Sequence, residues 1–398
     1  MSKISEASPA RSRLMRLSSR RASVLMYVGA VFLFWLSLYA YVPTLPTYVE
    51  SKADTLALVG IVLAQYGLWQ AIVRFPLGVA ADALGRQKPF IVFGFALSAL
   101  GAIVMASAKN VGQLALGRAV TGLAAATWVP LVVVFTALFP ASDTVRATAL
   151  LTFIASAGRM VATGVNGPLN ELGGYALSFF VAAGAAGLAI LMVLPAPTRR
   201  RPARRPSFSG IGRLITRRDV SLPAILAAVS QYASWAGTFG FFPILAKRLG
   251  ATDITLSVLM TLHIGVVTVS NLAASAIVNR IGARNLVYAG FLTLAGSLGL
   301  AALAPSLLFL FIAQVGMGLS QGIAYPVLMG LSIRHVDDDN RTTAMGLHQA
   351  VYAIGMFAGP WFSGILADSI GIQPMLGVTA FGCLILGVSL TRLIPRRV

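Results

Sequence analysis

Two arginines lie deep within long apolar stretches of this sequence. Arg118 lies in "LALGRAVTGLAAA" (114–126), and Arg159 lies in "LLTFIASAGRMVATGVNG" (150–167). A charged side chain in such a stretch costs free energy unless it faces a partner or a water-filled cavity. All 12 Asp and Glu residues lie at the ends of apolar stretches or in the loops between them, so none can neutralise either arginine at matching depth. Guanidinium groups without a carboxylate partner favour binding of an anionic, zwitterionic or polar neutral molecule.

Further polar side chains accompany these arginines at helical spacing. They recur at intervals of three, four or seven residues, so that each set shares one face of a helix. A lone residue of this kind more often forms a hydrogen bond between helices than it binds a ligand. Several sets together predict a polar cavity in the middle of the protein. The predicted substrate-binding residues are Arg118, Arg159, Asn166, Gln231, Trp235, His263, Gln314, Gln321, Tyr325, His348 and Tyr352.

The histidines and the cysteine do not form a metal site. The three histidines are scattered, and Cys383 is the single cysteine, so ligand spacing is lacking. His263 and His348 are candidates for proton coupling, because imidazole titrates near neutral pH. Either could equally act as an uncharged hydrogen-bonding group.

Residue patterns of catalysis are also lacking. The sequence contains no H-E-x-x-H, no convincing Ser-His-Asp set and no glycine-rich loop that would cradle a phosphate. The stretch "HVDDDN" (335–340) is hydrophilic and has poor geometry for a metal. We therefore expect neither an enzyme nor a direct use of ATP, and no cofactor.

The composition of the chain indicates which kind of secondary structure positions these residues. Hydrophobic residues make up 57% of 398, charged residues only 11%, and the mean hydropathy is +0.81. Apolar runs of about 20 residues, each long enough to cross the hydrocarbon core, recur along the whole length. The sequence therefore predicts an all-α membrane protein with twelve spans. Their approximate cores are 24–46, 55–81, 89–107, 111–138, 147–169, 173–194, 220–245, 254–279, 285–303, 307–332, 343–367 and 374–393.

The basic excess, a formal charge of +19, is concentrated in two segments. Residues 1–22 hold six cations and residues 197–218 hold eight. With both termini in the cytoplasm, cytoplasmic segments carry 24 Lys and Arg and the outer loops carry four, while Arg74, Arg118 and Arg159 lie within spans. This asymmetry follows the positive-inside rule. It indicates contact with membrane lipids rather than nucleic acid, and "GIGRLI" (210–215) is expected to lie on the membrane surface.

An internal repeat divides the chain. Gly122 and Pro130 match Gly318 and Pro326, and the pair at 167–168 matches the pair at 359–360. Two six-span copies joined by a basic linker are typical of transporters built from repeats. The predicted segments are a basic cytoplasmic N-terminus (1–22), an N-terminal six-helix half (23–195), a cytoplasmic Arg-rich linker (196–219) and a C-terminal six-helix half with a short cytoplasmic tail (220–398).

Three motifs resemble those of the major facilitator superfamily, and the resemblance covers essentially the whole chain. "GVAADALGRQKP" (78–89) is similar to the family's loop signature between the second and third spans. Arg118 and Gly122 match the signature of the fourth span. "GMFAGP" (355–360) has the G-x-x-x-G-P pattern of the family's antiporters, although it falls in the eleventh span rather than the fifth. The resemblance implies the family fold, with both termini cytoplasmic.

The loop signature implies a gate. The candidate partners of the Asp82 carboxylate are Arg86 in the same loop and the N-terminal end of another helix, which in the family is the start of the eleventh span, here near Arg341. Such a contact would join the two halves on the cytoplasmic side and stabilise the outward-open state. We expect Gly78 to allow close helix packing and Gly85 to form the turn.

These observations predict a secondary transporter that moves a small organic solute by alternating access. We expect an exporter of an anionic or polar neutral compound, with protons as a candidate coupling ion. The alternative is an uptake symporter or facilitator of the same fold, and a more remote one is a non-transporting receptor or scaffold. We expect a monomer that spans the cell membrane of a prokaryote several times.

Overall fold

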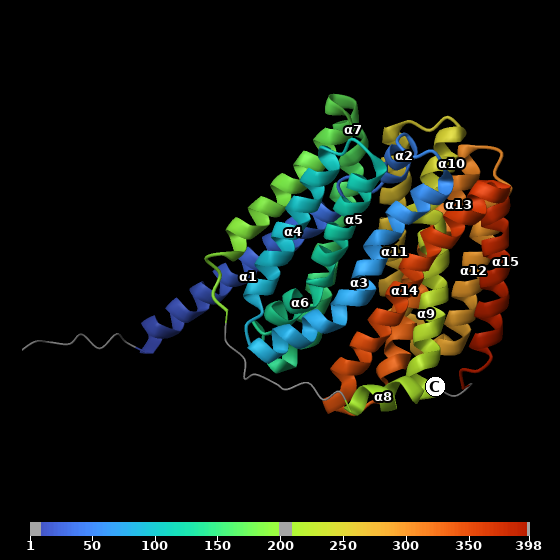
Figure 1. Ribbon diagram of the computed structural model, residues 1–398. Helices are drawn as coiled ribbons and strands as arrows, with labels where there is room; N and C mark the ends of the chain where they lie inside the picture. Colours follow the sequence, from blue (N-terminus) through green and yellow to red (C-terminus); the bar gives the residue numbers. More distant parts are fainter. Residues whose placement is uncertain (1–8, 199–208, 396–398) are drawn as a thin grey trace, which may run out of the picture.

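The computed structural model describes residues 9–198 and 209–395, and within that range it leaves the side chains of 9–19, 82, 141, 145, 209–211 and 338–342 undescribed. The described residues form a bundle of helices without a strand (Figure 1). Ten helices in this part of the chain are long and apolar enough to cross a membrane. The all-α membrane fold predicted from composition is therefore confirmed.

The helices before the linker are α1 (Pro9–Tyr39), α2 (Leu45–Glu50), α3 (Leu56–Leu84), α4 (Lys88–Ala106), α5 (Val111–Ala126), α6 (Trp128–Thr136), the short η1 (Ala141–Asp143) and α7 (Thr144–Val193). We call α1–α7 the N-terminal half. After the linker come α8 (Ser209–Thr216), α9 (Arg218–Ala236), η2 (Gly237–Phe241), α10 (Phe242–Arg248), α11 (Asp253–Ile281), α12 (Ala283–Ala302), α13 (Leu307–Ile333), α14 (Asp338–Ile370) and α15 (Ile372–Thr391). We call α9–α15 the C-terminal half.

α7 consists of two helical segments. Its 50 residues would extend about 75 Å as one straight helix, more than twice the hydrocarbon thickness of about 30 Å. The backbone leaves helical geometry at Gly173 and at Gly174, whose φ of 67° suits glycine. The chain bends there, near the top of Figure 1.

Some predicted spans are broken in the structure. The first ends at Tyr39 and resumes as α2 at Leu45, and the seventh contains a π-helical segment, η2, between α9 and α10. π-helical segments commonly occur at functional sites. Sequence periodicity alone did not locate these breaks, because the apolar pattern continues through them.

The two ends of the bundle differ. α8, the start of α14 and the end of α15 lie at the bottom of Figure 1, which we call the linker end. α2, α10 and the bend of α7 lie at the opposite, distal end. Leu214 of α8 is buried against Val220, Val336 and Ala344. Leu214 of the predicted amphipathic piece therefore packs on the bundle itself, and contact of this piece with the membrane surface stays a prediction.

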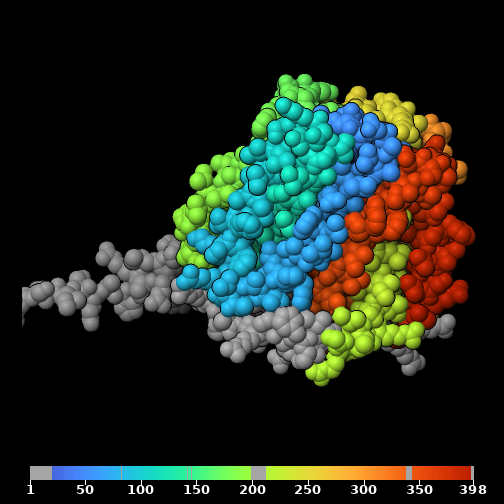
Figure 2. Space-filling view, in the orientation of Figure 1, coloured from blue at the N-terminus to red at the C-terminus, as the bar shows by residue number. Residues whose placement is uncertain are grey.

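The two halves meet along two pairs of helices, α3 with α14 and α7 with α11. α3 and α14 lie side by side on the face shown in Figure 2. Glycines permit the close approach: a Cβ on Gly67 would lie 2.5 Å from the Met356 carbonyl carbon, and one on Gly167 would lie 2.5 Å from the Ile254 Cα. Small residues at helix interfaces let backbones pack closely.

Candidate functional site

Arg159 projects from α7 toward aromatic rings of α1. Its guanidinium carbon lies 4.8 Å from the Trp35 ring centroid and 5.8 Å from that of Tyr39. Nη2 donates a hydrogen bond to the Ser156 Oγ at 3.2 Å, and Nε donates to the Ala155 carbonyl at 3.3 Å. Arg159 and Trp35 are only half-buried, although they contact each other between α7 and α1.

Arg118 of α5 is more deeply enclosed, with 3% of its surface exposed. Its guanidinium carbon lies 4.1 Å from the Tyr66 ring centroid and 6.0 Å from that of Trp235, so it contacts both halves. Its Nε and Nη1 atoms have no hydrogen-bond acceptor within the described part of the chain. A buried N–H group without an acceptor costs free energy.

A third arginine, Arg74 of α3, resembles Arg118 and Arg159 in that its guanidinium lies over an aromatic ring. Its Nη2 donates to the Gln70 Oε1 at 2.7 Å, and its guanidinium carbon lies 5.9 Å from the Tyr352 ring centroid in the opposite half. Its Nε also lacks an acceptor among the described residues. A cation within an apolar stretch was the signal that could have identified Arg74 as a site residue, but no polar side chains at helical spacing accompanied it.

Among the side chains that the structure describes, no carboxylate forms an ion pair with any of these three arginines. The ion pairs between described side chains are Arg217–Asp219, Lys247–Asp253 and Arg248–Glu50. Aromatic faces and neutral oxygens surround the guanidinium groups instead. Cation–π contacts of this kind are worth about 0.5–2 kcal/mol each. They hold the cations in place without neutralising their charge.

The C-terminal half contributes a column of rings. Trp235 stacks on Tyr66 with centroids 5.4 Å apart and on Phe239 with centroids 4.8 Å apart. Phe239 belongs to η2 and meets His263 edge-to-face at 5.9 Å. Tyr325 and Tyr352, with centroids 5.9 Å apart, are half-buried at the same interface.

His263 is fully buried and hydrogen-bonded on both ring nitrogens. Nε2 lies 2.9 Å from the Gln321 Oε1, and Nδ1 lies 3.4 Å from the Gln314 carbonyl oxygen. The Gln314 side chain in turn accepts a hydrogen bond from Thr238 at 2.8 Å. These contacts fix Phe239 and its neighbours. Gln231 is also buried, on α9 one turn before Trp235.

His348 lies apart from these rings. Its Nδ1 is 2.7 Å from the Ser332 Oγ, which also donates to the Val220 carbonyl. The histidine thus joins α14 to α13 and α9 inside the C-terminal half. This position differs from the predicted place beside Tyr352 in the cavity, although the two residues are one helical turn apart.

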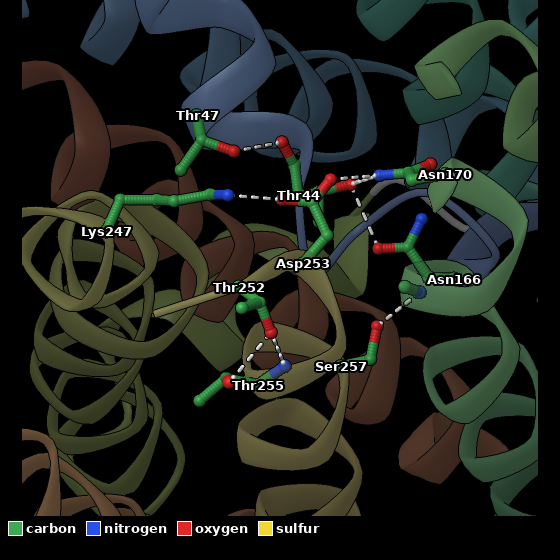
Figure 3. A network of polar contacts seen from close by, with 10 residues as sticks. Thr44, Thr47, Asn166, Asn170, Lys247, Thr252, Asp253, Thr255 and Ser257 are labelled. Atoms are coloured by element: carbon green, nitrogen blue, oxygen red, sulfur yellow. Dashed lines mark hydrogen bonds and ion pairs between the residues drawn. The ribbon is translucent and has the colours of Figure 1, made fainter. Parts of the chain in front are cut away.

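Asn166 likewise lies elsewhere than predicted, in a polar network at the distal end (Figure 3). Its Oδ1 accepts a hydrogen bond from Thr44 at 2.9 Å, and its Nδ2 donates to Ser178 at 3.0 Å. Asn170, one turn further along α7, donates to Thr44 and to Asp253 of α11, both at 2.9 Å. Asn166 shares a helix face with Arg159, but α7 places it among Thr44 and Ser178 rather than beside the rings.

The same distal region holds further contacts between the halves. Gly167 N–H donates to the Ser257 Oγ at 2.6 Å, and Arg248 pairs with Glu50 at 3.0 Å. The Leu56 N–H, in the first turn of α3, donates to Asp368 near the end of α14. The halves are therefore joined at the distal end.

The predicted gate lies at the linker end. The side chains of Asp82 and Arg341 lie outside the described residues. Arg86 is exposed, and Gly85 has a φ of 59° in the turn between α3 and α4, as expected of a turn glycine. A Cβ on Gly78 would meet no atom of the described residues within 4 Å, and the side chains of residues 338–342, at the start of the eleventh span, are outside that set, so close packing at Gly78 stays a prediction.

Lys88 adds a contact to this loop that the motif did not predict. Its Nζ donates to the carbonyls of Leu194 at 2.6 Å and Ala196 at 2.8 Å. These carbonyls lie at the end of α7, where a cation is favourable. The loop cation therefore ties α4 to α7 within the N-terminal half.

Comparison with known proteins gives a family match over nearly the whole chain. The model of the Major Facilitator Superfamily matches residues 27–230 and 224–398. "Multidrug resistance protein MdtH" of Aeromonas salmonicida is 27% identical over 364 residues, which cover 83% of this chain and 87% of that protein. "Quinolone resistance protein NorA" of Staphylococcus aureus is 26% identical over 163 residues, covering 41% of this chain and 42% of NorA.

Other similarities are shorter or more distant. "Inner membrane transport protein YajR" of Escherichia coli is 38% identical over 97 residues, which cover 24% of this chain and 21% of YajR. A bacterial homologue of the lysosomal transporter Spinster, solved in an inward-facing conformation, superposes with a TM-score of 0.81 at 14% identity, covering 94% of this chain and 96% of that one. The nucleoside transporter NupG superposes with a TM-score of 0.75 at 15% identity, covering 94% and 100%. At such identity these structures show a shared fold.

Proposed function

Because this chain belongs to the Major Facilitator Superfamily, we propose that it is a secondary active exporter of a small anionic or polar neutral organic solute. Members of this family are membrane transporters, so the chemistry to be explained is recognition rather than catalysis. The mechanism we propose is alternating access between the N-terminal and C-terminal halves.

One observation carries the substrate proposal. Arg74, Arg118 and Arg159 lie in membrane-spanning helices and contact rings and neutral oxygens, with no ion pair to a described carboxylate. Even on lenient scales an arginine at mid-membrane depth costs about 2.5–3.5 kcal/mol. An anionic group of the substrate would supply the missing charge, whereas a cationic substrate would be repelled.

The remaining predicted site residues have distinct roles in this proposal. Trp235, Gln321, Tyr325 and Tyr352 form the walls of the site. Gln231, His263 and Gln314 support those walls through burial and hydrogen bonds. His263 is the histidine closest to the ring column and is our candidate for proton coupling. Asn166 and His348 act in the packing of helices instead.

The topology we propose has twelve spans and both termini in the cytoplasm. Counting α7 as two spans, and α9, η2 and α10 together as one, supports this number. The basic N-terminus and linker support a cytoplasmic linker end. In that orientation the distal hydrogen bonds close the outer side. We further propose a monomer in a bacterial cell membrane, with the linker cations contacting anionic lipid.

Export is the direction we propose. MdtH and NorA, which are named for drug resistance, match 83% and 41% of the chain. The loop signature at 78–89 and the glycine–proline pair of the eleventh span support the same direction.

The experiment that tests this function is a thermal-shift screen of the purified protein against anionic, neutral and cationic compounds. We expect anions and polar neutral molecules to raise the melting temperature, because binding stabilises the folded state. Arg159→Gln and Arg74→Gln should weaken the shift. The matched control is Arg284→Gln, because Arg284 also lies over a ring, that of Tyr288, but on α12 outside the site. Preferential stabilisation by lipophilic cations would contradict the proposal.

A further inference from the structure

We propose that the substrate carries a planar aromatic ring next to its anionic group, and that Trp235 is the residue that selects for the ring. This inference rests on the proposed function, because it refines the substrate class of the same site. It starts from the ring column that joins the two halves.

The ring column consists of Tyr66, Trp235 and Phe239, and it crosses the interface between the halves at the contact of Tyr66 with Trp235. Tyr66 comes from α3 in the N-terminal half, whereas Trp235 and Phe239 come from the other half. Tyr66 and Trp235 are nearly parallel, with an interplanar angle of 18°, and Trp235 and Phe239 are inclined by 26°. Tyr66 and Trp235 are each 4% exposed.

A transport cycle by alternating access must break the contact between Tyr66 and Trp235. When the halves move relative to one another, the Tyr66 face separates from the Trp235 face, because the two rings belong to different halves. Separation uncovers two large apolar surfaces in the middle of the membrane protein. A flat ring of the substrate, placed between them, would restore the stacking that the conformational change removes.

The position of Arg118 implies that the anionic group of the substrate would lie beside its aromatic ring. The Arg118 guanidinium carbon is 4.1 Å from the Tyr66 centroid, so the guanidinium lies against the ring, and its Nε and Nη1 atoms have no acceptor among the described residues. A ligand carboxylate could accept from these N–H groups while its ring stacks against Trp235. Arg159, with Trp35 and Tyr39, offers a second arrangement of the same kind. Both arrangements favour a molecule in which charge and ring are adjacent.

An alicyclic acid of the same size would satisfy only part of this site. It could pair with the guanidinium, but it lacks the planar faces that match the rings on either side. The site should therefore distinguish two acids that differ only in aromaticity.

The test is isothermal titration of the purified full chain with 2-naphthoate and with decahydro-2-naphthoate, which share the carbon skeleton and the charge. We expect 2-naphthoate to bind about 3- to 10-fold more tightly, the range expected for aromatic pairing beyond simple burial. Trp235→Leu should remove this preference, and Trp235→Phe should retain most of it. Trp361→Leu is the control, because Trp361 stacks with Phe357 and Phe362 within α14, away from the ring column.

The outcomes separate this inference from the proposed function. Equal affinity for the two acids, with both weakened by Arg159→Gln, would overturn the aromatic preference while supporting an anion site. Binding of neither acid would overturn both. If Trp235→Leu does not yield a monodisperse protein, Tyr66→Leu and Tyr66→Phe provide the same comparison on the opposite wall. A preference that persists in the leucine variants would contradict the role of the column.

Discussion

Asn170 Nδ2 donates a hydrogen bond to Asp253 Oδ2 across 2.9 Å, and this bond joins α7 of one half to α11 of the other. The opposite carboxylate oxygen, Oδ1, lies 2.5 Å from the Lys247 Nζ within the C-terminal half. Asp253 thus acts as a latch between the halves at the distal end (Figure 3). A hydrogen bond to a charged group contributes about 1.5–3 kcal/mol.

Replacing Asp253 by Asn should shift the protein toward a conformation that is open at the distal end. We expect the population of that conformation to rise about tenfold or more, because the charge-assisted bonds are lost. The measurement is the labelling rate of Thr261→Cys, on the face of α11 that meets α7, with an impermeant maleimide in a Cys383→Ala background. Asp54→Asn, at an exposed distal carboxylate, is the control. An unchanged labelling rate in Asp253→Asn would exclude the latch.

Gly167→Ala should also separate the halves at the distal end. The added methyl group would lie 2.5 Å from the Ile254 Cα and 2.6 Å from the Asp253 carbonyl oxygen, so the backbones must move. Overpacking of this kind costs about 1–3 kcal/mol. We expect a lower melting temperature and faster labelling of Thr261→Cys. Gly184→Ala is the matched control, since a Cβ there meets no atom within 4 Å. Equal melting temperatures for the two variants would show that α7 and α11 are not tightly packed.

Asp82→Asn should impair transport while leaving expression largely unchanged. The prediction comes from the loop signature, in which the carboxylate gates the cytoplasmic side. We expect Gly78→Ala in the same motif to be tolerated, because a Cβ there would meet no atom of the described residues within 4 Å. Transport of a hit compound into inside-out vesicles distinguishes the two variants. Wild-type turnover in Asp82→Asn would remove the gating role.

The ion pair of Arg217 with Asp219 at the linker end should make the folding stability depend slightly on pH. The hydrogen bond from Arg217 holds the pKa of the Asp219 carboxyl below its usual value, while Arg217 also donates to the His335 carbonyl. A lowered pKa in the folded state adds stability above pH about 4, and that stability is lost as the pH falls through the folded-state pKa. Because the Arg217 and Asp219 side chains are both more than a third exposed, we expect this ion pair to contribute less than about 1 kcal/mol to the free energy of unfolding. Melting curves of wild type and Asp219→Asn between pH 3 and 7 should converge at the acid end; curves that stay parallel would contradict this effect.

The sequence was sufficient to predict the helical membrane fold, the family and the presence of arginines within apolar spans. These features follow from composition, repeat spacing and the cost of charge in an apolar stretch, all of which are local properties. It did not predict which helical faces meet. Asn166 and His348 lie on the expected stripes, yet α7 and α14 place them in packing contacts rather than beside the rings. Arg74 was recognised as buried charge, but its contact with Tyr352 depends on the pairing of α3 with α14, which no local pattern encodes.

The central claim is that unpaired guanidinium groups in the bundle recognise an anionic substrate that the protein moves across the membrane. Counterflow of the best anionic hit in proteoliposomes tests it most directly, with wild type, Arg159→Gln and the control Arg284→Gln compared at equal reconstitution. We predict that wild type and Arg284→Gln accumulate the labelled anion and that Arg159→Gln loses at least about 90% of the initial rate, since loss of a charged partner costs upward of about 1.4 kcal/mol, or tenfold. Unchanged counterflow in Arg159→Gln, or counterflow of lipophilic cations in place of anions, would contradict the claim.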